Sequence, residues 1–240
     1  MLEQYHLQGI LFLDIETVPQ TASFDELSET GQALWEKKSA RFRQESQTAK
    51  DVYAKAGIYA EFGKVICISV GLIVNRSGTY GIRVKSFYGD DEKNLLSEFT
   101  GMVNKFSNKS DVYLCAHNGK EFDFPYIIRR LLINGLPVPE ILNVPGKKPW
   151  EVPFLDTLEL WKFGDHRHYA SLDLLAYALD IPTPKDDIDG SMVGEVYYQE
   201  DDLERIVRYC EKDTLAVGQL FLRYRGQKLI ATEDVEYAGE

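Results

Sequence analysis

The chain has 240 residues and a formal net charge of −11, with 44% hydrophobic and 27% charged residues, which is the composition of an ordinary globular protein. Its acidity argues against broad electrostatic adhesion to nucleic acid, which depends on neutralisation of phosphates by Lys and Arg, but it leaves room for a local site. No apolar run approaches the roughly 18 residues of a membrane span, and the N-terminus lacks the pattern of a signal peptide, so we expect a cytoplasmic protein with no membrane segment.

The first expected element is a strand over Ile10 to Thr17, an apolar run that ends by placing two acids two residues apart. Because side chains alternate along a strand, Asp14 and Glu16 project from one face while Leu13 and Ile15 enter the core. The two carboxylates then lie roughly 7 Å apart along the backbone, and a divalent cation between them would relieve their repulsion. The same pattern fits a strand end with two solvated acids, and this stretch by itself supports both interpretations equally.

Residues from about 24 to 62 are expected to be mostly helical and charged. We interpret them as an insertion packed on the edge of a single domain that covers residues 1–240. The basic side chains of this segment predict a solvated face, formed by Lys37, Lys38, Arg41 and Arg43.

The middle and the end of the chain predict a hairpin followed by helices and short strands in turn. The hairpin strands cover Lys64 to Asn75 and Tyr80 to Tyr88, with turn residues between them. After them we expect a helix over 91–106, a strand over 111–116, a helix over 126–133, a proline-rich connection over 135–153 and a strand over 154–156. Four helices are expected next: one over 157–163, one that begins after an N-cap at Ser171, one over 191–198 and one over 201–225. Such an order predicts an α/β fold, a mixed sheet with helices on both faces.

The three cysteines, Cys67, Cys115 and Cys210, are isolated and form neither a disulfide framework nor a CxxC metal site. Cys67 and Cys115 fall in apolar strand-like runs, which predicts that they are small core residues.

Two further acidic groups lie downstream. Asp123 ends the segment His117 to Asp123, which directly follows a buried strand. The carboxyl ends of adjoining parallel strands share one edge of a sheet, so Asp123 falls near the acids of the first strand, unless it simply caps the next helix. Tyr209 and Asp213 are four residues apart on the last helix and therefore lie on one face, a phenol beside a carboxylate. The alternative for this pair is an exposed contact of the kind that is common on helices.

Three other polar groups near these segments invite functional interpretations. We interpret His117 as part of the loop structure, not as a catalytic residue. Asp156 ends a strand and is expected to cap or to hydrogen-bond, with a supporting role behind the other acids as the alternative. The segment Asp165 to His168 resembles a metal site in composition, but its polar setting favours solvent exposure or phosphate contact.

The order of the three groups along the chain resembles a known enzyme family. Asp-x-Glu at Asp14 to Thr17, Asn-x3-Phe-Asp at Asn118 to Asp123 and Tyr-x3-Asp at Tyr209 to Asp213 are similar to the motifs of the DEDD-type 3′-5′ exonucleases, which have a ribonuclease H-like fold. The last motif resembles the DEDDy branch, since Arg208 stands where the DEDDh branch would carry histidine. The first two are most similar to the proofreading exonuclease domain of family B DNA polymerases. The resemblance covers about Ile10 to Phe221, with no polymerase domain attached.

This resemblance implies a ribonuclease H-like mixed sheet of five to six strands and a site that holds two divalent ions. The implied metal ligands are the four acids of the motifs, Asp14, Glu16, Asp123 and Asp213. Oxygen ligands alone favour Mg²⁺ or Mn²⁺ over zinc, which prefers nitrogen and sulfur. Tyr209 is implied to orient the attacking water. The implied contacts with the 3′-terminal nucleotide are Thr17, Asn118 and Phe122.

The implied function is a metal-dependent 3′-5′ exonuclease that acts on the 3′ ends of single-stranded DNA and releases nucleoside 5′-monophosphates by a two-metal mechanism. An exoribonuclease of the same superfamily stays open, because the metal chemistry does not depend on the 2′-hydroxyl. A catalytically silent nucleic-acid-binding module is the third alternative, although such a module has no need of four converging acids.

Overall fold

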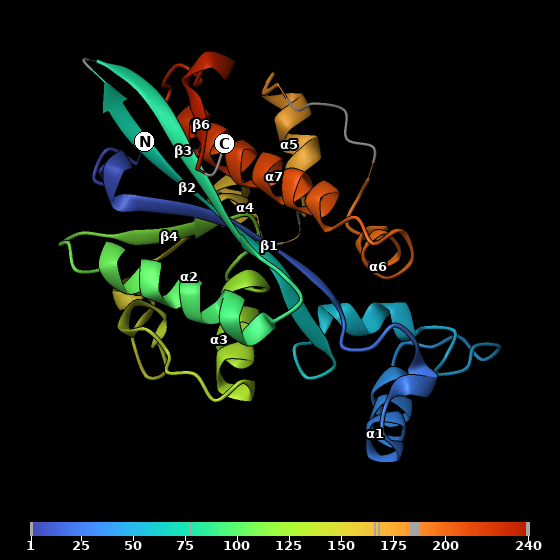
Figure 1. Cartoon of the computed structure of the whole chain (residues 1–240). Helices are drawn as coiled ribbons and strands as arrows, with labels where there is room; N and C mark the ends of the chain where they lie inside the picture. The colour runs from blue at the N-terminus through green and yellow to red at the C-terminus, as the bar shows by residue number, and fades with distance from the viewer. Residues whose placement is uncertain (1, 77, 166, 168, 183–187, 239–240) are drawn as a thin grey trace.

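The centre of the computed structural model, which describes residues 2–76, 78–165, 167, 169–182 and 188–238, is a six-stranded mixed sheet (Figure 1). The strands are β1 (Ile10–Pro19), β2 (Gly63–Arg76), β3 (Thr79–Tyr88), β4 (Tyr113–Ala116), β5 (Phe154–Asp156) and β6 (Val235–Tyr237). They lie in the order β5-β4-β1-β2-β3-β6. The α-helices are α1 (Glu29–Ser39), α2 (Glu92–Phe106), α3 (Asp123–Ile133), α4 (Thr157–Lys162), α5 (Leu172–Ala178), α6 (Val193–Glu195) and α7 (Leu203–Tyr224). The expected ribonuclease H-like α/β fold is confirmed.

Strand β1 lies in the middle of the sheet, antiparallel to β2 and parallel to β4, which is in turn parallel to β5. The carboxyl ends of β1, β4 and β5 therefore face the same edge, where ligands bind in sheets of this kind. Strand β4 pairs with β1 over Ile10 to Phe12 and ends at Ala116. Because β1 runs on to Pro19, β4 does not pair with its edge beyond Phe12.

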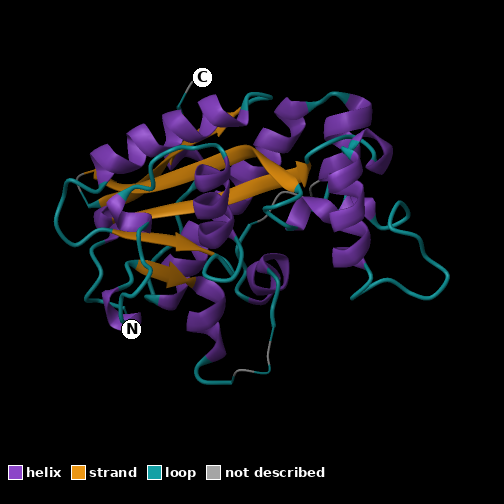
Figure 2. Ribbon diagram, turned by 90° about the horizontal axis from the view of Figure 1, so that it is seen from below, coloured by secondary structure: helices purple, strands orange, loops and turns teal. Residues whose placement is uncertain are grey.

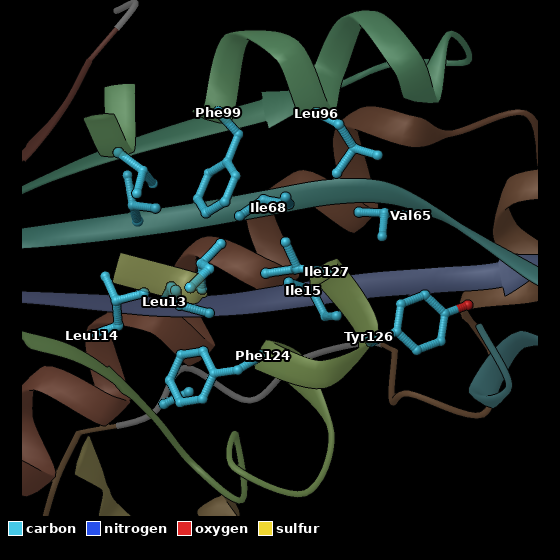
Figure 3. Close-up of a cluster of buried hydrophobic side chains, with 14 of the residues drawn as sticks. Leu13, Ile15, Val65, Ile68, Leu96, Phe99, Leu114, Phe124, Tyr126 and Ile127 are labelled. Atoms are coloured by element: carbon cyan, nitrogen blue, oxygen red, sulfur yellow. The ribbon is translucent and has the colours of Figure 1, made fainter. Parts of the chain in front are cut away.

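Helices cover both faces of the sheet (Figures 1 and 2). On one face, Leu13 and Ile15 of β1 join a buried cluster with Phe99 of α2 and Ile127 of α3 (Figure 3). Full burial of an apolar side chain of this size stabilises the folded state by about 1.5–3 kcal/mol relative to exposure. On the other face, Phe12 of β1 packs among residues of α7. The alternation that places Leu13 and Ile15 in one core therefore turns their neighbours toward α7.

The segment from 24 to 62 is less helical than expected. It contains α1 and two short 3-10 helices, Phe24–Glu26 and Tyr53–Ile58, and turns make up much of the remainder. Its apolar side chains converge on the fully buried Trp35, whose indole N–H donates to the Ala49 carbonyl at 2.9 Å. Apolar side chains from several short segments reach this tryptophan, so they do not follow the continuous apolar stripe that a long packed helix would present. Figure 1 shows α1 set apart from the helices that cover the sheet.

Two features near the C-terminus also differ from expectation. The helix expected over 191–198 is α6, continued by a π-helical turn, Val196–Glu200, that ends at Asp201 in a left-handed conformation. Strand β6, which was not expected, pairs with β3 at the edge of the sheet. The connection between α5 and α6 includes residues 183–187, which lie outside the described residues. None of the described helices is long and apolar enough to cross a membrane.

Candidate functional site

The two acids of β1 lie on the face that α7 covers. Asp14 is opposite Ser69 and Glu16 is opposite Cys67 on β2, and a register shift follows between Glu16 and Thr17. Glu16 is buried, and Asp14 is half-buried. The alternation expected from the sequence is confirmed, and these carboxylates are not the solvated acids of an open strand end.

Asp123 is the first residue of α3 and is only 4% exposed. The N-cap of α3 is Phe122, so the alternative that Asp123 caps this helix is wrong. The carboxyl group faces the backbone N–H of Ile15 at the part of β1 that β4 leaves free. Burial raises the pKa of Asp123 to about 7, the charge of Asp156 adds to this rise, and the nearby N–H groups oppose it.

Tyr209 and Asp213 lie one turn apart on α7, which packs against β1 and β2. The phenol is within hydrogen-bonding reach of the Asp213 carboxylate. Burial raises the pKa of Tyr209 well above its usual range, and the charges of Asp213, Glu16 and Asp14 raise it further. The expected i,i+4 pair therefore faces the acids of β1 and is not an isolated contact on an exposed helix.

The four acids act on one another through their charges. Burial is the main reason that the pKa of Asp14 lies well above its usual range, and the charges of Glu16, Asp213 and Asp123 raise it further. Burial is also the main cause of the raised pKa of Glu16, and the charges of Asp213, Cys67 and Asp123 add to the rise. Among the described residues, the Oδ2 atom of Asp14 is buried without a hydrogen-bond partner. A buried oxygen of this kind among mutually repelling carboxylates fits a divalent cation, which would supply both the missing partner and the missing charge.

A cysteine that sequence reasoning missed as a site residue lies beside the β1 acids. In the part of the chain that the structure describes, Asp14, Glu16 and Cys210 each place a ligand atom within 4.8 Å of those of the other two. The group does not include Asp123 or Asp213, whose charges nevertheless reach it. The position of Cys210 beside Tyr209 in the third motif was the only sequence signal that could have pointed to it.

Each residue expected to contact substrate also makes a contact within the protein near this edge of the sheet. Thr17 lies within hydrogen-bonding reach of the Tyr126 hydroxyl. Asn118 has a φ of 61° and donates its backbone N–H to Asp156. The Phe122 ring is half-buried, with its centroid 5.3 Å from that of Tyr126. Their contact with a nucleotide remains a prediction.

The three other polar groups take structural roles or lie partly outside the described residues. His117 hydrogen-bonds through Nδ1 to Thr157 at 2.9 Å and through Nε2 to the Ala170 carbonyl at 2.8 Å, and burial lowers its pKa. Asp156 is the N-cap of α4. Asp165 accepts from Arg167 in an exposed loop, while residues 166 and 168 lie outside the described part of the chain.

Comparison with known proteins gives one family match. A family model described as a predicted 3′-5′ exonuclease related to the exonuclease domain of PolB matches residues 58–237. This range includes Asp123, Tyr209 and Asp213, whereas β1 with Asp14 and Glu16 precedes it. No curated protein matches the chain.

Proposed function

The chain belongs to the family of predicted 3′-5′ exonucleases related to the exonuclease domain of PolB, and from this membership we propose that it hydrolyses phosphodiester bonds at the 3′ end of single-stranded DNA and releases nucleoside 5′-monophosphates. The observation that carries the proposal is that acids from three motifs far apart in sequence lie close enough to shift one another's pKa values. Asp213 on α7 and Asp123 on α3 both raise the pKa values of Asp14 and Glu16 on β1. A structural core has no use for four acids that destabilise one another.

The acids of this site are proposed to hold two Mg²⁺ or Mn²⁺ ions. The ligands are Asp14, Glu16, Asp123 and Asp213. Their oxygen atoms are the donors that these ions prefer, and the unpartnered Oδ2 of Asp14 supports the assignment. When bound, two divalent ions supply charge neutralisation at the phosphate and activation of the attacking water.

Tyr209 is proposed to orient the attacking water through its hydroxyl group. Burial is the largest cause of its raised pKa, so the phenol keeps its proton at neutral pH even when cations offset the neighbouring carboxylates. It therefore acts as a hydrogen-bonding partner of the water and not as a base. The Asp213 carboxylate holds the ring of Tyr209 in place from one turn further along α7.

The 3′-terminal nucleotide is proposed to lie at the carboxyl edge of β1 and β4. Thr17 follows the acids on β1, and Asn118 and Phe122 lie between the end of β4 and the start of α3. Phe122 offers a partly exposed ring on which a base can stack, a contact that tolerates any base.

A degradation assay tests the proposal. Single-stranded DNA and RNA of equal length, each labelled at the 5′ end, are incubated with the full chain and Mn²⁺, with and without EDTA. We expect a ladder of shortened DNA that Asp14→Asn and Glu16→Gln abolish, whereas Glu45→Gln, at an exposed carboxyl of the insertion, leaves the rate unchanged. Shortening of RNA alone would identify an exoribonuclease, and binding without shortening would overturn the assignment as an enzyme.

A further inference from the structure

A buried thiol lies among the proposed metal ligands and has no part in the proposed reaction. Cys210 of α7 is fully buried, and its Sγ atom lies within 4.8 Å of carboxylate oxygens of both Asp14 and Glu16. The thiol donates a hydrogen bond to the backbone carbonyl of Asp14 at 3.4 Å. A second thiol, that of Cys67 opposite Glu16 in the strand pair, is within hydrogen-bonding reach of Cys210.

These donors differ in kind from a set of four carboxylates. Magnesium and manganese prefer oxygen, whereas sulfur ligands select zinc and other soft divalent ions. We propose that Asp14, Glu16 and Cys210 form a binding site for a thiophilic divalent cation, Zn²⁺, which shares the two β1 acids with the site for the activating ions. Zinc bound there excludes those ions from Asp14 and Glu16 and inhibits the enzyme. The inhibition rests on the proposed function, but the binding of zinc does not.

The geometry requires only small movements of side chains. The three ligand atoms are at most 4.8 Å apart, while bonds of about 2.0–2.3 Å in a tetrahedral zinc site place ligand atoms roughly 3.5 Å apart. We expect rotation of the carboxylates about their side-chain bonds to close this gap. The unpartnered Oδ2 of Asp14, which also supports the site for the activating ions, marks a place for a cation beside Cys210. On binding, the Sγ–H bond of Cys210 breaks, its proton passes to solvent, and the sulfur electron pair forms the bond to zinc.

Cobalt absorption provides a direct test, because Co²⁺ replaces zinc in such sites and a thiolate ligand gives it a charge-transfer band. The full chain is titrated with Co²⁺ alone, and Zn²⁺ is then added. We expect the wild-type protein to develop the band and to lose it when zinc displaces cobalt. Cys210→Ser should show no band, while Cys115→Ala, at a buried cysteine of β4 outside this ligand group, should keep it.

Zinc affinity gives the second measurement. Loss of a group that merely supports a ligand weakens metal binding by about 10–100-fold, so loss of the thiol ligand should weaken Zn²⁺ binding by at least about tenfold. Cys210→Ser retains a donor for the Asp14 carbonyl, so it should fold, and its melting temperature without metal checks this. In the nuclease assay with Mn²⁺, the serine variant should need correspondingly more zinc for half-inhibition.

Three results would overturn the proposal: a charge-transfer band that persists in Cys210→Ser, a band lost only in Cys67→Ser, or equal zinc affinity in folded wild-type and Cys210→Ser proteins. The outcome is separable from that of the proposed function. An active exonuclease without the cobalt band contradicts the zinc site alone, and a cobalt band in a protein that degrades no nucleic acid contradicts the exonuclease alone.

Discussion

The Asp156 carboxylate at the end of β5 accepts the backbone N–H of Asn118 at 3.0 Å, in the turn where Asn118 adopts its left-handed conformation. Its other oxygen accepts the N–H of Lys120 at 3.1 Å, and Leu158 and Glu159 at the start of α4 donate to the first oxygen. One buried side chain therefore caps a helix and fixes the loop that leads to Asp123. The sequence predicted the cap, and the support of the loop emerged only in the structure.

Replacement of Asp156 by alanine should destabilise the protein by about 2–3 kcal/mol, because it removes a helix cap and leaves loop N–H groups without an acceptor. Asp156→Asn is the matched control. Its remaining oxygen can serve Asn118 and α4, and only the bond from Lys120 is lost. Urea unfolding measures both variants. An asparagine variant as unstable as the alanine variant would contradict the assigned bonds.

Binding of Mn²⁺ should raise the melting temperature of the wild-type chain, because an ion that binds only the folded state stabilises it, by about 2.7 kcal/mol at 100 times its dissociation constant. Asp123→Asn should reduce this rise. Asp111→Asn is a suitable control, since Asp111 is exposed and has a φ of 55°, which asparagine tolerates. An undiminished rise in Asp123→Asn would remove Asp123 from the set of ligands.

Tyr209→Phe should lower kcat by about 10²-fold, a loss of the size seen when one well-placed hydrogen-bonding group is removed from an active site. The rise in melting temperature with Mn²⁺ should persist, since the phenol is not proposed as a metal ligand. Single-turnover degradation of labelled DNA together with thermal melting separates these effects. A variant with normal turnover would show that Tyr209 does not orient the attacking water.

Without metal, stability should fall as pH rises from about 4 to about 7. The pKa of Asp123 is about 7 in the folded protein, against 3.8 when unperturbed, so the folded state binds more protons than the unfolded state in this interval. The buried carboxyl must lose its proton as pH increases, which disfavours the fold. Urea unfolding in EDTA at several pH values should show this decline, and Asp123→Asn should make it shallower. Equal slopes would show that Asp123 titrates normally.

Local sequence was enough to predict the position of a side chain wherever that position depends on a single helix or strand. The alternation of β1 placed Asp14 and Glu16 on one face, and the helical period placed Tyr209 above Asp213. Ser171 caps α5 as expected, since a cap depends on neighbouring residues only. The order of the motifs also indicated the family correctly, and the matched range, residues 58–237, contains the second and third motifs.

Only the tertiary structure decided which side chains meet across elements. The approach of Cys210 to Asp14 depends on how α7 lies over β1, and the pairing of β6 with β3 depends on a strand distant in sequence. The cluster around Trp35 stands where mostly helical structure was expected over residues 24 to 62, for the same reason. Sequence patterns report the face of an element, whereas contacts between faces follow from packing, which local periodicity does not encode.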